Sequence, residues 1–181
     1  MHVEGASGGE SVRAHARLVD DVVQSLTRLI VADARAAGLE PTPLVVVALG
    51  GYGRGELHPS SDIDLMVVYD GALSAFVQRL MQELLYTLWD LVLQVGHSLR
   101  SLEDCVAMAR TDFPSRTSMQ EARLIEGDRR LFARFGRVLR DNVYRQDFGE
   151  FLAMTLAERE QRYRKFGASP YIGEPNVKES A

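Results

Sequence analysis

The chain has 181 residues and a formal net charge of −4, from 21 basic and 25 acidic side chains. This length suits one domain with its own core, and the acidic balance argues against a dedicated nucleic-acid-binding protein, which would normally be basic. The single cysteine excludes an intrachain disulfide and a cysteine-based metal cluster.

Nothing in the sequence indicates membrane insertion or secretion. The longest apolar stretches are far too short to cross a bilayer. The N-terminus lacks the basic start and apolar centre of a signal peptide. We therefore expect a cytoplasmic protein.

The first seventy residues predict a helix and then two strands. Residues 4–10 are rich in Gly and Ser and predict a frayed end. Apolar residues at helical spacing then predict a helix from about residue 11 to 37. The apolar, β-branched run at 44–49 predicts a buried strand, and a second apolar run at 65–69 predicts another.

The segment between these two strands carries the strongest functional signal. Residues 50–65 read GGYGRGELHPSSDIDL. Gly50 and Gly51 allow a sharp turn and a close approach of a ligand to the backbone. Asp62 and Asp64 are two positions apart, so in a strand both carboxylates project from one face. Two hard oxygen ligands beside a glycine turn predict a site for a divalent metal and a triphosphate.

Three competing motifs do not fit this segment. A P-loop needs Gly-Lys-Ser/Thr, which the chain lacks. The glycines of Gly51-Tyr52-Gly53-Arg54-Gly55 are too closely spaced for a dinucleotide fingerprint. An EF-hand needs more oxygen ligands, whereas residues 65–69 are apolar.

The remaining chain predicts a helix at 73–93, a strand at 94–100, a helix at 101–109 and further helices from 112 onwards. We expect breaks in the helical part near 127–128 and 147–149, and an irregular end at 167–181. All predicted strands thus lie in the first hundred residues. The expected fold class is α+β, a small mixed sheet flanked by helices and followed by a helical part. We expect a core with its N-terminal helix at 1–110, and a helical segment at 111–181 that packs on it and is truncated at its C-terminal end.

The order strand, Gly-Gly, polar loop, Asp-x-Asp, strand resembles the nucleotidyltransferase superfamily that includes DNA polymerase beta. Within it, the chain resembles the bacterial PII uridylyltransferases. Further similar segments are LWDL at 88–91, VGHSLR at 95–100, EARL at 121–124 and EPNVKE at 174–179. The resemblance runs from about residue 44 to the end and implies the polymerase-beta-type fold.

The resemblance also implies an activity and partners. The activity is transfer of UMP from UTP to a tyrosine of the PII signalling protein, in nitrogen regulation. In the longer parent protein it implies a C-terminal hydrolase domain and amino-acid-sensing domains that are missing from this sequence. Two alternatives stay open: a transferase of the same fold with another acceptor, as in relatives fused to cyclic-nucleotide-binding modules, or a non-catalytic nucleotide-binding scaffold.

Each candidate site residue has a role under this hypothesis. Asp62 and Asp64 are the expected catalytic metal ligands for Mg²⁺ or Mn²⁺ in a two-metal displacement. Gly50 and Gly51 would cradle phosphates with backbone N–H groups, and Arg54 would clamp the triphosphate or be an ordinary surface arginine. Ser61 either donates to a phosphate or caps the turn before the strand.

Members of the superfamily commonly place a third carboxylate on a nearby strand, and the strand at 94–100 has none. His97, beside Ser98, is a candidate metal ligand or general base, or a structural residue. Asp90 is either the missing acid or an ordinary helix residue. Two further sets of residues carry open alternatives. The pair Glu121 and Arg123 forms a structural ion pair or contacts the nucleotide, and Lys178 reaches the nucleotide or lies in a tail that pins the helical part.

Overall fold

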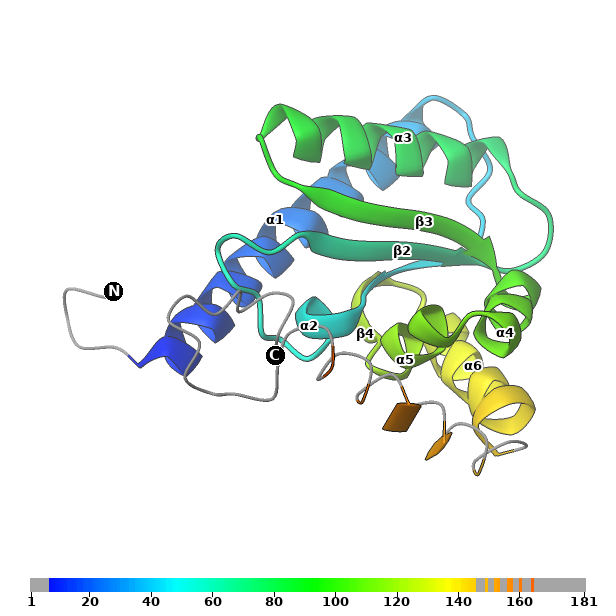
Figure 1. Cartoon of the computed structure of the whole chain (residues 1–181). Helices are drawn as coiled ribbons and strands as arrows, with labels where there is room; N and C mark the ends of the chain where they lie inside the picture. Colours follow the sequence, from blue (N-terminus) through cyan, green and yellow to red (C-terminus); the bar gives the residue numbers. More distant parts are fainter. Residues whose placement is uncertain are drawn as a thin grey trace.

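The computed structural model describes residues 7–145, together with residues 149, 152, 153, 156, 157, 160 and 164. Four strands form one sheet in the order β3-β2-β1-β4 (Figure 1). They are β1 (Leu44–Ala48), β2 (Ile63–Tyr69), β3 (Val95–Ser101) and β4 (Arg123–Gly127). β1 is antiparallel to both β2 and β4, and β2 is parallel to β3. The expected small mixed sheet is therefore confirmed.

Helices cover both faces of this sheet, and a short helix, α2 (Gly50–Gly53), joins β1 to β2 (Figure 1). One face packs on α1 (Gly8–Ala36) and α3 (Ala75–Asp90). The other packs on α4 (Leu102–Thr111), α5 (Phe113–Gln120), α6 (Arg129–Leu139) and the π-helical turn η2 (Arg140–Tyr144). Every residue of β1 is buried, as its unbroken apolar run requires. Among the described residues no helix is long and apolar enough to cross a membrane.

The N-terminal helix begins earlier than the sequence predicted. The Ser7 hydroxyl accepts a hydrogen bond from the Glu10 N–H, and the Glu10 carboxylate accepts one from the Ser7 N–H at 2.8 Å. This capping box satisfies N–H groups that the first turn would otherwise leave without partners. Residues 8–10, which we expected to be frayed, are therefore helical.

The expectation that all strands precede residue 100 is wrong. β4 lies beside β1, within the segment that was predicted to be helical. Gly127 explains part of this placement: its φ is +117°, and a Cβ there would lie 2.3 Å from the Leu44 carbonyl oxygen. Only glycine allows β4 to leave β1 in this way. The expected break at 127–128 is confirmed, because Asp128 caps α6. The segment 167–181 lies outside the described residues.

The single cysteine gives a simple test of how α4 packs on the sheet. Cys105 is fully buried on α4, and burial raises the pKa of its thiol to about 12. We expect a thiol reagent at pH 8 to label the native protein at least roughly a hundredfold more slowly than the protein in denaturant, because only the exposed thiolate reacts. Fast labelling of the native protein would show that α4 does not pack as described.

Candidate active site

The two carboxylates that the sequence singled out lie at the start of β2. Asp62 directly precedes the strand and Asp64 is its second residue, and both are exposed. A Cβ on Gly50 would lie 3.8 Å from both the Asp64 carboxylate and the Ser118 hydroxyl. The end of β1, the start of β2 and helix α5 therefore meet at one point.

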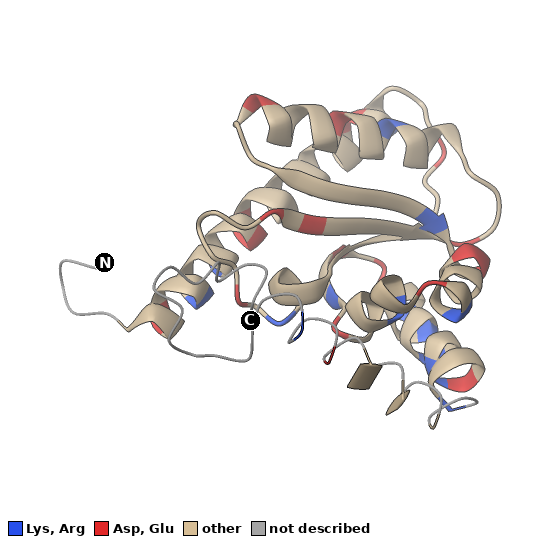
Figure 2. Ribbon diagram, in the orientation of Figure 1, with Lys and Arg blue, Asp and Glu red and all other residues tan. Residues whose placement is uncertain are grey.

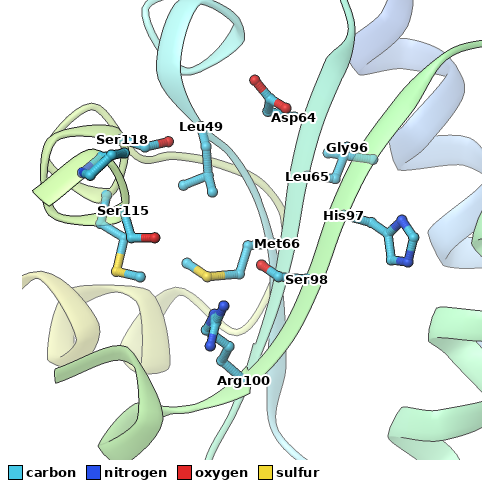
Figure 3. Close-up of a pocket in the computed structure, with 12 residues that line it drawn as sticks. Leu49, Asp64, Leu65, Met66, Gly96, His97, Ser98, Arg100, Ser115 and Ser118 are labelled. Atoms are coloured by element: carbon cyan, nitrogen blue, oxygen red, sulfur yellow. The ribbon is translucent and has the colours of Figure 1, made fainter. Parts of the chain in front are cut away.

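A cavity of about 320 Å³ extends from this point along the sheet (Figure 3). Asp64 lies at one end of the cavity and Arg100 at the other. Leu49, at the N-cap of α2, lines it together with α5, which contributes Pro114, Ser115, Ser118 and Met119. The strands contribute Asp64, Leu65, Met66, Gly96, His97, Ser98 and Arg100. Because a charged group lies at each end, with apolar side chains and the hydroxyls of Ser98 and Ser115 between them, the cavity suits a ligand with polar ends.

Gly96 lies directly opposite Asp64 in the parallel register of β2 and β3. A Cβ on Gly96 would lie 2.4 Å from the Asp64 carboxylate, so a side chain there would displace it. The strand position where a third acid could face Asp64 is thus taken by glycine. No cluster of three His, Cys, Asp or Glu side chains suited to a metal occurs among the residues that the structure describes.

The donor set nevertheless fits a divalent cation. Mg²⁺ is commonly bound through one or two carboxylates, with substrate phosphates and water as its other ligands. Asp62 and Asp64 offer two such groups at the start of β2, and neither Gly50 nor Gly96 crowds Asp64 with a side chain. These two carboxylates could therefore hold the ion together with a phosphate-bearing ligand.

Arg54 lies near the expected phosphate cradle but outside the cavity lining. Its guanidinium contacts the Glu121 carboxylate at 2.6 Å and the Glu56 carboxylate at 3.4 Å. The hydrogen bond with Glu121 is the main reason why the pKa of Arg54 is raised. Another guanidinium nitrogen lies 3.6 Å from the Cβ position of Gly51. Arg54 is thus placed beside the glycine turn by two carboxylates.

Arg123 holds α2 against the N-terminal helix. It binds both carboxylate oxygens of Asp20 at 2.7 and 3.1 Å, and donates to the backbone oxygens of Tyr52 and Gly53 at 3.0 and 3.2 Å. Its guanidinium also lies 5.4 Å from the centre of the Tyr52 ring. Burial, together with the nearby Asp20 carboxylate, raises the pKa of Tyr52. Arg123 is therefore a positioning residue for the turn that carries Gly50.

Of the two alternatives for Glu121 and Arg123, the ion pair between them is wrong, and contact with the nucleotide stays a prediction. Glu121 lies at the C-terminal cap of α5 and contacts Arg54, whereas Arg123 begins β4 and reaches back to α1. Their spacing in the sequence gave no information about these partners, because both partners lie in distant elements.

The other candidate site residues lie in different parts of the structure. His97 points away from the cavity in Figure 3, and its ring packs edge-on against Trp89 at 5.7 Å. Asp90 is exposed at the end of α3, outside the cavity lining. Ser61 lies in the turn before β2 and donates its N–H to the His58 carbonyl at 3.0 Å. Ser98 does line the cavity.

The last of the expected site residues, Lys178, falls outside the described residues. The sequence reasoning missed most of the cavity lining, including the polar residues Arg100 and Ser118. A signal for Arg100 was present, because it follows Gly96 and Ser98 at alternate positions of one strand and must share their face. No local pattern indicated Ser118, since its position depends on how α5 packs on α2.

A family model described as a nucleotidyltransferase domain matches residues 37–125. The chain is similar to a curated bifunctional uridylyltransferase/uridylyl-removing enzyme of Azospirillum brasilense, with 41% identity over 180 residues, which are 96% of this chain and 19% of that protein. The enzyme of the same description from Caulobacter vibrioides (strain NA1000 / CB15N) is 41% identical over 178 residues, 97% of this chain and 19% of that protein. The chain thus spans about a fifth of the length of these relatives.

A solved toxin–antitoxin structure with AMP-PNP is 16% identical. The superposition covers 77% of this chain and 94% of the chain in that structure, with a TM-score of 0.37.

Proposed function

Residues 37–125 of this chain form a nucleotidyltransferase domain of the DNA polymerase beta-like type, and from that premise we propose that the protein transfers UMP from UTP to a tyrosine of a PII signalling protein. The observation that carries the proposal is the placement of Asp64, two residues after Asp62, beside Gly50 and at one end of the cavity. The relatives named uridylyltransferase support the choice of nucleotide. The reaction would take place in the cytoplasm, where UTP is available.

Under this proposal Asp62 and Asp64 would hold Mg²⁺ or Mn²⁺ together with the bound nucleotide. Such ions supply charge neutralisation for the attacking oxygen and the leaving pyrophosphate. The N–H groups of Gly50 and Gly51 face the phosphates, and Arg54 exchanges part of its contact with Glu121 for a phosphate oxygen. The glycine at position 96 leaves the Asp64 carboxylate room to keep its orientation.

The two carboxylates of the site favour an acceptor hydroxyl as acidic as that of tyrosine. Within the described residues no third carboxylate stands beside Asp62 and Asp64 to take the proton of the nucleophile. A phenol, with a pKa of about 10, loses its proton far more readily than an alcohol and needs less help from a base. A two-carboxylate site therefore suits a tyrosine hydroxyl better than a serine or sugar hydroxyl.

Incubation of the protein with each nucleoside triphosphate in turn, Mg²⁺ and a PII protein tests the proposal. We expect intact-mass measurement to show the addition of one uridylyl group to each PII chain, with UTP only. Modification with another nucleotide would change the proposed substrate. If the protein binds the nucleotide but leaves PII unmodified, the result would favour a different acceptor or a non-catalytic scaffold. The two exposed carboxylates argue against the scaffold.

Nucleotide and metal should bind together. UTP with Mg²⁺ at about a hundred times its Kd should add about 2.7 kcal/mol to the free energy of unfolding. In a chain of this size that raises Tm by roughly 5–10 °C. UTP with EDTA should have much less effect, because its phosphates would face Asp62 and Asp64 without a cation between them. Differential scanning fluorimetry measures both shifts, and equal shifts would contradict the metal site.

A further inference from the structure

The cavity beyond Asp64 is built for an organic ring more than for phosphates. Its middle is walled by Leu49 and by Met66 and Met119, two side chains that are almost fully buried. Its lining includes one arginine, Arg100, and no lysine. Phosphates are bound by several N–H groups or cations, whereas rings are bound by apolar walls with a few polar groups.

Arg100 keeps its guanidinium available at the end of this cavity. Of the described residues, none forms an ion pair with Arg100 within 4.0 Å, in contrast to Arg54 and Arg123. The acids around it are Asp104 and Asp112, and each is engaged in a helix cap. The Asp104 carboxylate accepts from Ser101, and Asp112 accepts from the Ser115 N–H.

These caps are the main cause of the lowered pKa of Asp104 and of Asp112, and the charge of Arg100 is a smaller cause in both. The guanidinium is thus near these two acids without being tied to either. Figure 3 shows Arg100 and Ser98 pointing to the side of the sheet on which Met66 lies. Both side chains can therefore meet a ligand that enters along the cavity.

The distance from the carboxylates to Arg100 matches a nucleoside. Gly96 pairs with Asp64, and Arg100 follows four residues later on the same strand. Four strand residues span about 13 Å. A nucleotide held by its α-phosphate at Asp64 would lay its ribose along the apolar walls and bring the far edge of its base to Arg100. Its outer phosphates would extend the other way, to Gly50 and Arg54.

We propose, on the premise of the nucleotide transfer above, that Arg100 binds the base of the nucleotide and selects uracil over cytosine. A guanidinium can only donate hydrogen bonds. The 4-carbonyl oxygen of uracil accepts them, whereas cytosine presents an amino group, another donor, at that position. The Ser98 hydroxyl, which donates and accepts, can complete the contact with the adjacent ring nitrogen.

The test compares Mg²⁺ complexes of non-hydrolysable UTP and CTP analogues by titration calorimetry, without an acceptor protein. The wild-type protein should bind the UTP analogue at least roughly tenfold more tightly, since hydrogen bonds to a charged group are worth that factor or more. Arg100→Met should reduce the ratio to near one, by weakening the UTP analogue. The control, Arg54→Met, should weaken both analogues by the same factor, because it acts on phosphates.

Equal weakening of both analogues by Arg100→Met would assign Arg100 to the phosphates and overturn the proposal. An unchanged affinity ratio in this variant would also overturn it, and so would a wild-type protein that binds both analogues equally. Arg100→Gln is a second variant in case the first unfolds: its amide both donates and accepts, so it should also bind the two analogues equally. Loss of selectivity in these variants would stand even if PII proves not to be the acceptor. A wild-type protein that binds neither analogue would overturn this inference and the proposed function together.

Discussion

Replacing either Asp62 or Asp64 by asparagine is expected to lower the rate of UMP transfer by roughly a thousandfold or more. The reason is that an amide keeps the shape of the carboxylate but removes the charge that holds a divalent ion at the α-phosphate. Both side chains are exposed, so the free energy of unfolding should change by no more than about 0.5–1 kcal/mol. Single-turnover transfer measured at saturating Mg²⁺ and UTP gives the rate, and thermal denaturation gives the stability.

Asp90→Asn is the matched control for this experiment. Asp90 is also an exposed acid, but it lies at the end of α3 and outside the cavity. Its replacement should leave the transfer rate within about twofold of the wild type, as expected of a surface substitution. If both Asp62→Asn and Asp64→Asn keep more than a tenth of the wild-type rate, the metal site must be placed elsewhere.

The second large effect is expected on stability. A Cβ on Gly53 would lie 2.2 Å from the Glu121 carbonyl oxygen and 3.1 Å from the Ala48 carbonyl oxygen. Both are backbone atoms, which cannot move aside as a flexible side chain can. Gly53→Ala should therefore lower the free energy of unfolding by about 3 kcal/mol, with a fall in Tm of roughly 6–12 °C. Because α2 would shift away from α5, Mg²⁺–UTP affinity should fall as well.

Gly136→Ala tests whether this cost comes from the site and not from the type of substitution. Gly136 lies in α6, and a Cβ there would meet no atom within 4 Å. Alanine favours helix more than glycine, so this variant should gain about 0.5–1 kcal/mol. Chemical denaturation of the two variants beside the wild type measures both changes, and a similar change in both would refute the steric explanation.

The sequence was sufficient for the parts of the site that depend on local patterns. The pair of glycines predicted a close approach at Gly50, where the Asp64 carboxylate lies. That Asp62 and Asp64 share a face stays a prediction from strand alternation, because Asp62 precedes β2. The observed strands β1, β2 and β3 lie close to the predicted ranges. Apolar runs bounded by glycine or polar residues are signals that neighbouring residues carry by themselves.

The parts that could not be predicted depend on residues far apart in the chain. β4 pairs with β1, more than seventy residues earlier, with a register shift that no local pattern specifies. The partner of Arg123 is Asp20, 103 residues away. His97 was a candidate because of its chemistry, yet only the packing of α3 determines that its ring meets Trp89. Long-range packing of this kind overrides local propensity.

The contact between Arg123 and Asp20 also limits how far the protein can be shortened. The family match starts at residue 37, after the end of α1. A fragment cut there would lose Asp20 and leave Arg123, whose side chain is only 33% exposed, without its carboxylate. It would also uncover the sheet face on which Val23 and the rest of the buried side of α1 pack. A piece that keeps the whole of α1 with its cap, and with it these contacts, starts at Ser7, some thirty residues before the family match.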